Sequence, residues 1–157
     1  MSTPDARCVI ILSARSSGSS ALQNLLARSP GVRHVERTPH YESETLFWNK
    51  AASLLHRPQV RMADSRLPFP RAEAGDMLRS LLTENLGPSY VPPPGDEQLV
   101  FQGWRDLCLH YAPVFVEKTP HHLHQWGALE LMLEGLARTP EVAPLVIGLV
   151  RNPMDTI

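Results

Sequence analysis

The sequence predicts an α/β fold of three layers, in which helices flank a parallel β-sheet. Short apolar runs of strand length alternate along the chain with longer segments of helical periodicity. The first run, Val9–Leu12, leads into a loop of small residues and then directly into a helical pattern. With 157 residues, 43% of them hydrophobic, the chain is long enough for one core of moderate size, so we expect a single domain over residues 1–157.

Helices are expected where apolar residues recur at spacings of three and four and where capping signals bound the segment. Ser19 or Ser20 is the expected N-cap of the first helix, and Asp96 that of the fourth. Ser29-Pro30-Gly31 ends the first helix, and Gly87-Pro88 ends the third. The expected helices are Ser19–Arg28, Tyr41–Leu55, Arg71–Leu86, Asp96–Leu109 and His122–Thr139.

Strands are expected in the short apolar runs between these helices, and an intervening helix makes neighbouring strands parallel. They are Arg7–Ser13, the short extended piece Val32–Val35, Val114–Glu117 and Leu145–Val150. The proline-containing segments 56–70 and 91–95 are expected to be loops. Because a new helical pattern is only starting where the chain stops, we expect an incomplete domain, truncated at its C-terminus.

The composition excludes several classes of function. A formal net charge of −1 provides no basic field for nucleic acid, and no apolar run is long enough to span a bilayer. The first apolar run is also too short for a signal peptide. Cys8 and Cys108 form no disulfide framework, and we expect buried thiols of a reducing compartment. The expected location is cytoplasmic, without nucleic-acid or membrane partners, while the oligomeric state stays open.

The loop from Ser13 to Ser20 has the composition of a phosphate-binding loop. Small side chains let backbone N–H groups approach an anion, hydroxyls add donors, and the following helix contributes the positive end of its dipole. The loop departs from G-x-x-x-x-G-K-S/T, since Ser13 replaces the first glycine and Ser19 the lysine when Gly18 is the second glycine. It also departs from the dinucleotide pattern G-x-G-x-x-G. We expect a P-loop-containing fold with a phosphorylated ligand, but no ATP- or GTP-hydrolysing site.

Two basic residues follow other strands of the predicted sheet. Lys118 lies in V-F-V-E-K-T-P, at the end of one strand, and Arg151 lies in L-V-R-N-P-M-D, at the end of another. Ligands of open parallel sheets bind at the carboxyl ends of the strands. The loop, Lys118 and Arg151 are therefore expected to converge on one anionic ligand.

These three motifs, in this order, resemble those of the sulfotransferases that use 3′-phosphoadenosine 5′-phosphosulfate (PAPS), above all the bacterial-type and tyrosyl-protein branches. Members carry R-S-G-T-S/T after the first strand, E-K-T-P in mid-chain and V-R-N/D-P-x-D for the 3′-phosphate. The matching segments here are Ser17–Ser20, Glu117–Pro120 and Val150–Asp155. The resemblance implies a sulfotransferase-like α/β domain that moves a sulfuryl group from PAPS to an unidentified hydroxyl or amine acceptor, without a metal.

The resemblance also implies roles for individual residues. Lys118 would stabilise the leaving group, Arg151 would bind the 3′-phosphate, and the loop would hold the 5′-phosphosulfate, in a reaction that depends on positioning and electrostatic stabilisation. Arg15 stands one residue before the usual arginine position of the family, so either its guanidinium or the loop backbone carries the phosphosulfate contact. The expected donor-binding residues are Arg15, Ser16, Ser17, Gly18, Ser19, Ser20 and Arg151.

A general base must take the proton of the acceptor. In the tyrosyl-protein branch a glutamate lies six residues after the proline that closes the first helix, and the same count from Pro30 gives Glu36. His34 and His40 compete for this role, because other branches use histidine. Glu36 ranks first and His40 second.

Two other functions stay open: a nucleotide-binding fragment without turnover, and a P-loop kinase for a small metabolite, which would require a metal ion. The histidines of His121-His122-x-His124 are expected to be polar surface rather than metal ligands. Phe47 and Trp48 are expected to pack in the core rather than line an acceptor cleft.

Overall fold

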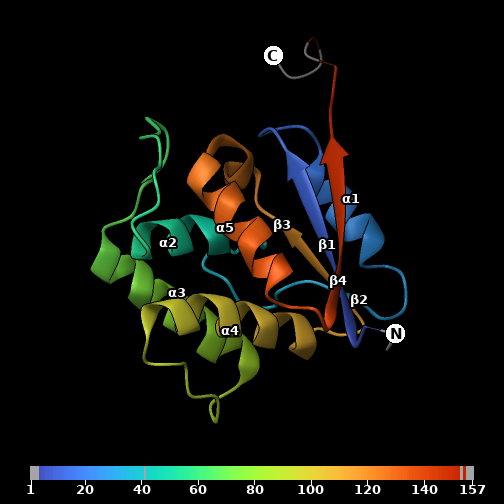
Figure 1. Ribbon diagram of the computed structural model, residues 1–157. Helices are drawn as coiled ribbons and strands as arrows, with labels where there is room; N and C mark the ends of the chain where they lie inside the picture. The colour runs from blue at the N-terminus through green and yellow to red at the C-terminus, as the bar shows by residue number, and fades with distance from the viewer. Residues whose placement is uncertain (1–3, 41, 153, 155–157) are drawn as a thin grey trace.

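A computed structural model describes residues 4–40, 42–152 and 154. The described residues form a four-stranded parallel sheet in the order β2-β3-β1-β4 (Figure 1). The predicted α/β class, with a parallel sheet flanked by helices, is confirmed. The strands are β1 (Ala6–Ser13), β2 (Val32–Arg33), β3 (Val114–Lys118) and β4 (Val142–Leu149).

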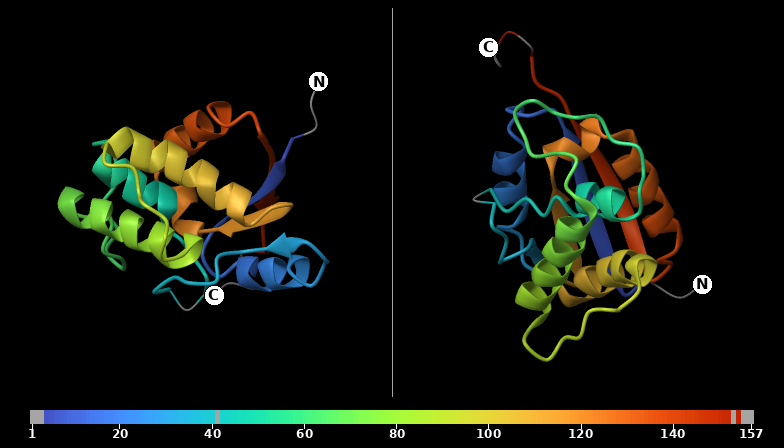
Figure 2. Two further views of the ribbon diagram at one scale, coloured as in Figure 1. Left: turned by 90° about the horizontal axis from the view of Figure 1, so that it is seen from below. Right: turned by 90° about the vertical axis from the view of Figure 1, so that its left-hand side faces the viewer.

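The helices lie on both faces of this sheet (Figure 2). Successive side chains of β1 point to opposite faces: Cys8 and Ile10 belong to the large core beneath α2–α5, whereas Val9 and Ile11 pack beneath α1. The chain therefore forms three layers. The helices are α1 (Ser19–Leu26), α2 (Phe47–Leu54), α3 (Arg71–Leu86), α4 (Asp96–His110) and α5 (Trp126–Ala137), with a short 3₁₀ helix, η1, at Pro120–His124.

Local signals predicted the bounds of α3 correctly, but the helix expected over Tyr41–Leu55 begins only at Phe47. Position 41 lies outside the described residues. The Phe47 N–H donates to the hydroxyl of Thr45 (3.0 Å), and that hydroxyl donates to Glu117 on β3 (2.8 Å). Bonding to the sheet thus holds the residues just before α2 out of the helix.

The helix expected over His122–Thr139 is divided into η1 and α5. Gln125 lies between them in an extended conformation, and its side-chain amide forms two hydrogen bonds with the backbone of Val60, at 2.8 and 2.7 Å. The 56–70 loop therefore interrupts the helical pattern. The extended piece expected over Val32–Val35 is also shorter, because β2 ends at Arg33.

The predicted N-caps are wrong, because each lies one or two residues after the observed cap. Gly18 and Gly95 occupy the N-cap positions of α1 and α4, so Ser19 and Ser20 lie inside the first turn of α1. Asp96 likewise begins α4 and forms an ion pair with Arg71 (2.7 Å) instead of capping the helix. No side chain caps the N-terminus of α1.

Aromatic rings fill the centre of the large core, as expected for Phe47 and Trp48. The ring centroids of Trp48 and Trp104 lie 4.9 Å apart, and those of Trp104 and Phe115 lie 5.8 Å apart. The third tryptophan, Trp126 at the start of α5, is 71% exposed. Cys8 and Cys108 are buried, unbridged thiols, as predicted. None of the helices in the described part of the chain has the length and apolar character needed to cross a membrane.

Candidate functional site

Parallel pairing aligns the carboxyl ends of three strands at one edge of the sheet. Ile11 of β1 lies opposite Lys118 of β3, and Ser13 lies opposite Leu149 of β4. The segments that follow these strands, together with the segment between β2 and α2, line a cavity of about 440 Å³. Its lining residues are Arg15, Ser16, Gly18, Ser19, Ser20, His40, Glu42, Glu44, Pro120, His121 and Arg151.

The loop between β1 and α1 lines this cavity with Arg15, Ser16 and Gly18, directly before the start of α1. Gly18 (φ 91°) and Ser16 (φ 61°) both adopt positive φ, which turns the chain sharply before α1 begins. The first hydrogen bond of α1 runs from Leu22 N–H to the Gly18 carbonyl (3.1 Å), and no side chain caps the helix. The N–H groups that precede Leu22 at the helix N-terminus thus have no acceptor within α1. Such N–H groups can donate hydrogen bonds to an anion.

Ser17 differs from its neighbours in the loop. Its side chain is buried, and its hydroxyl donates to the carbonyl of Ala14, closing the turn. It does not line the cavity. The structure therefore brings Ser16, Gly18, Ser19 and Ser20 into the site directly and gives Ser17 a supporting position.

Two arginines reach the same cavity from opposite ends of the chain. Arg15 lines it and forms an ion pair with Asp64 of the 56–70 loop. Arg151 follows β4, and its guanidinium donates to the Ser16 carbonyl at 3.4 Å. Pro153 and Asp155 of the predicted 3′-phosphate motif lie outside the described residues. The expected convergence of the loop and Arg151 is present in the geometry.

Lys118 lies beneath the loop rather than in the cavity. Its ammonium donates to Ser20 Oγ, the Glu42 carbonyl and Glu44 Oε1, each at 3.1 Å, and its side chain is fully buried. Lys118 therefore ties Ser20, at the start of α1, to the segment that precedes α2. Lys118 thus contacts two side chains that line the cavity, Ser20 and Glu44, but does not line the cavity itself.

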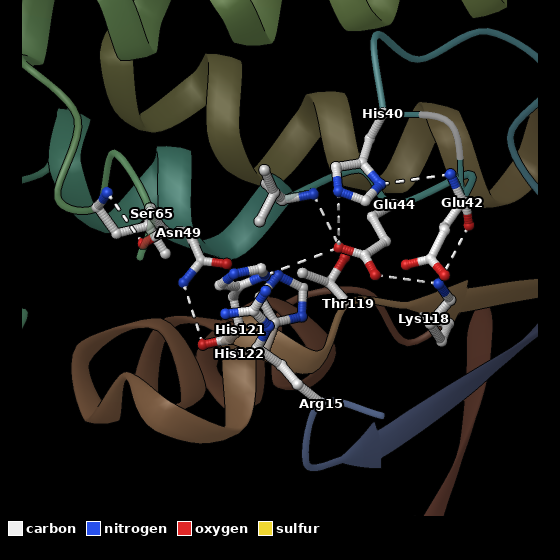
Figure 3. Close-up of polar contacts among 12 residues, drawn as sticks. Arg15, His40, Glu42, Glu44, Asn49, Ser65, Lys118, Thr119, His121 and His122 are labelled. Carbon is white, nitrogen blue, oxygen red and sulfur yellow. Dashed lines mark hydrogen bonds and ion pairs between the residues drawn. The ribbon is translucent and has the colours of Figure 1, made fainter. Parts of the chain in front are cut away.

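The buried carboxylate of Glu44 is the centre of the polar network (Figure 3). One oxygen accepts from Lys118, while Oε2 lies 3.6 Å from His40 Nε2 and 3.7 Å from His121 Nδ1. Burial alone would raise the pKa of Glu44, but the His121 ring, 3.7 Å away, and the charge of Lys118 lower that pKa to about 2. Glu44 is therefore ionised at neutral pH.

Two of the three neighbouring histidines are buried, which corrects the expectation of polar surface. His121 is 9% exposed and His122 is 1% exposed. Burial lowers the pKa of His122 to about 3, and its Nε2 accepts from the Trp48 N–H at 3.3 Å. Only His124 of the three has the expected exposure.

Glu36 lies away from the cavity, although it ranked first among the predicted bases. Its side chain is 68% exposed and pairs with Arg33 at 3.4 Å. The chain leaves the sheet after β2 because Asn85 of α3 accepts hydrogen bonds from the N–H groups of Glu36 (3.2 Å) and Arg37 (3.1 Å). The chain then turns back toward the cavity. As a result His40 lines the cavity and Glu36 does not.

Sequence reasoning missed Glu44 and His121. Glu44 fell inside a predicted helix, where a carboxylate is usually solvated, and His121 fell in a histidine run that resembled surface. A usable signal was present for Glu44, since Ser43-Glu44-Thr45 places a carboxylate among small polar residues just before an apolar run.

A second buried carboxylate, Glu117, precedes Lys118 on β3. It accepts from the hydroxyls of Thr119 (2.6 Å) and Thr45 (2.8 Å). Burial raises the pKa of Glu117 to about 7, against the lowering effect of these two hydroxyls and of Lys118. Glu117 belongs to the support of the site and does not line the cavity.

No protein-family model, curated protein or solved structure matches the chain.

Proposed function

We propose that the chain binds PAPS in the cavity at the carboxyl ends of β1, β3 and β4 and transfers its sulfuryl group to a hydroxyl or amine acceptor. One observation carries this proposal: the glycine-containing loop before α1, Arg15 and Arg151 line the same cavity as His40 and Glu44. The resemblance of the three sequence motifs to PAPS-dependent sulfotransferases adds support.

The charges suit a donor with anionic groups at two positions. Backbone N–H groups at the start of α1, together with Arg15, would bind the 5′-phosphosulfate. Arg151 would bind the 3′-phosphate, the group that distinguishes this donor from ATP-like nucleotides. Lys118, which donates to Ser20 Oγ, would add positive charge near the leaving phosphate oxygen.

In the proposed reaction the acceptor oxygen or nitrogen attacks sulfur in line, and the bond from sulfur to the bridging phosphate oxygen breaks. The bisphosphate nucleotide leaves with the bond electrons, and the acceptor proton passes to a base. His40 fits this role better than Glu36 because it lines the cavity. The ionised Glu44, 3.6 Å from His40 Nε2, would stabilise the imidazolium that forms.

Calorimetric titration with 3′,5′-adenosine bisphosphate tests the proposed donor site, with 5′-AMP and ATP as comparison ligands. We expect selective binding of the bisphosphate. Arg151→Ala should weaken it by about 10- to 100-fold, since a charge-assisted hydrogen bond contributes about 1.5–3 kcal/mol. Arg138→Ala, which removes an exposed guanidinium paired with Glu134, is the matched control. Equal binding of 5′-AMP, or an unchanged Arg151→Ala, would contradict the proposal.

A nucleotide-binding protein without turnover is the second candidate, and the full burial of Lys118 favours it. Its ammonium already has three protein acceptors and does not line the cavity. Incubation with PAPS and a panel of alcohols, phenols and amines separates the two functions. Release of the bisphosphate that depends on an acceptor and is lost in His40→Ala supports transfer, whereas tight binding without release supports the second candidate.

The ion pair between Arg15 and Asp64 leads to a prediction about nucleotide affinity. If Arg15 contacts the phosphosulfate, Asp64 competes with the nucleotide for its guanidinium. Asp64→Asn should then tighten bisphosphate binding by up to about fivefold, because an exposed ion pair contributes about 1 kcal/mol or less. Asp76→Asn, which makes the same charge change in an exposed pair with Arg79, should leave the affinity unchanged. If Asp64→Asn also has no effect, the loop backbone is the main contact.

A further inference from the structure

Three side chains of one short segment place metal-ligating atoms close together in the cavity. The ligand atoms of His40, Glu42 and Glu44 all lie within 4.8 Å of one another. His121, from η1 on the other side of the cavity, places its Nδ1 3.7 Å from Glu44 Oε2. The set thus combines two imidazoles with two carboxylates.

The unsatisfied atoms of this cluster are a second observation that favours a ligand. Glu44 Oε2 and His121 Nδ1 are both buried and have no hydrogen-bond partner among the described residues. Both residues line the cavity, and each is at least nine-tenths buried. Buried polar atoms without partners are costly, so a cation between them would relieve that cost.

We propose that His40, Glu42, Glu44 and His121 bind one divalent transition-metal ion of the zinc type. Nitrogen and carboxylate donors together suit zinc, whereas magnesium prefers an all-oxygen set. With bonds of about 2.0–2.2 Å, tetrahedral ligands lie about 3.4 Å apart. The separations of Glu44 Oε2 from the two histidine nitrogens, 3.6 and 3.7 Å, are close to that spacing.

The surrounding contacts are compatible with such an ion. Lys118 pairs with Glu44 Oε1, which leaves Oε2 for the metal, and Arg15 in the same cavity is paired with Asp64. Binding at His40 Nε2 would place the ring proton on Nδ1, so the long contact from the Glu42 N–H to Nδ1 (3.3 Å) would break. A metal ion and a proton would compete for His40, and a bound ion would therefore block base catalysis through this ring.

The experiment is titration of the full chain with Zn²⁺ alone, in competition with a chromophoric chelator, and with Co²⁺ as a spectroscopic probe. We expect one equivalent to bind, and Co²⁺ to show the intense visible bands of a tetrahedral site. Mg²⁺ at the same concentration should not compete. Because no nucleotide is present, the result is independent of the proposed sulfuryl transfer.

His40→Ala and Glu42→Ala test the ligands at half-buried loop positions, where the fold should tolerate substitution. Each should weaken zinc binding by roughly tenfold or more, since even residues that only orient ligands change metal affinity by about 10–100-fold. His124→Ala, which removes the exposed histidine of the same 3₁₀ helix, should bind zinc like the wild type. Unchanged affinity in both loop variants, equal loss in His124→Ala, or an octahedral Co²⁺ spectrum would overturn the proposal.

Discussion

Replacing Lys118 with methionine is expected to lower the free energy of unfolding by about 3–5 kcal/mol, the range for removing one partner of a buried ion pair. Methionine has a similar volume but leaves the Glu44 carboxylate buried without its cation, and it also leaves Ser20 Oγ and the Glu42 carbonyl without their donor. Urea denaturation at pH 7 measures the change. A loss below about 1 kcal/mol would mean that the pair is weak or solvated.

The double variant Lys118→Met/Glu44→Gln is the control, because it removes both charges. It should recover much of the lost stability, since neutral replacements of buried ion pairs are often tolerated. The pH dependence has a definite sign. The pKa of Glu44 falls from 4.5 to about 2 on folding, so its contribution is complete above pH 4.5 and is lost as the pH falls through about 2. The difference between Lys118→Met and wild type should shrink over that range.

The second large effect is expected from Glu117→Gln, which should stabilise the fold at alkaline pH. Burial raises the pKa of Glu117 from 4.5 to about 7, so the wild type loses stability as the pH rises from about 4.5 through about 7. The full loss corresponds to about 3 kcal/mol. Glutamine does not titrate, and its carbonyl can accept from Thr45 and Thr119 as the carboxylate does.

Denaturation midpoints of the Glu117→Gln variant and wild type, measured from pH 4 to pH 8.5, test this expectation. The two proteins should have similar stability near pH 4, and the variant should be the more stable one near pH 8. Lys118, Glu44 and Lys50 are the charged groups that act on Glu117, and none of them is changed by this substitution. Glu130→Gln, on an exposed position of α5, makes the same charge change and should show no such pH-dependent gain. A constant difference across the pH range would contradict the assigned titration.

The fold could be predicted because its signals are local. Apolar residues at spacings of three and four and the Gly87-Pro88 stop determine α3, and the small residues around Gly18 determine the loop before α1. Parallel topology then places Arg151 beside that loop without further information.

The path from β2 to α2 could not be predicted, because its contacts are remote in sequence. Asn85 holds Glu36 and Arg37 beside α3, while Glu117 and Thr119 hold Thr45 and Leu46 against β3. Glu36 was predicted by counting six residues from Pro30, which assumes that the chain after Pro30 leads directly into the cavity. The hydrogen bonds to Asn85 hold it beside α3 instead. For this reason the sequence argument ranked an exposed glutamate first and missed the buried Glu44.

The exposed indole of Trp126 gives the protein an intrinsic optical reporter at the start of α5. Trp48 and Trp104 are fully buried, so a soluble quencher such as iodide should suppress mainly the emission of Trp126. Trp126 begins α5 immediately after Gln125, which links η1 to the 56–70 loop. A change in quenching on addition of nucleotide or zinc would therefore report movement at this junction without any added label.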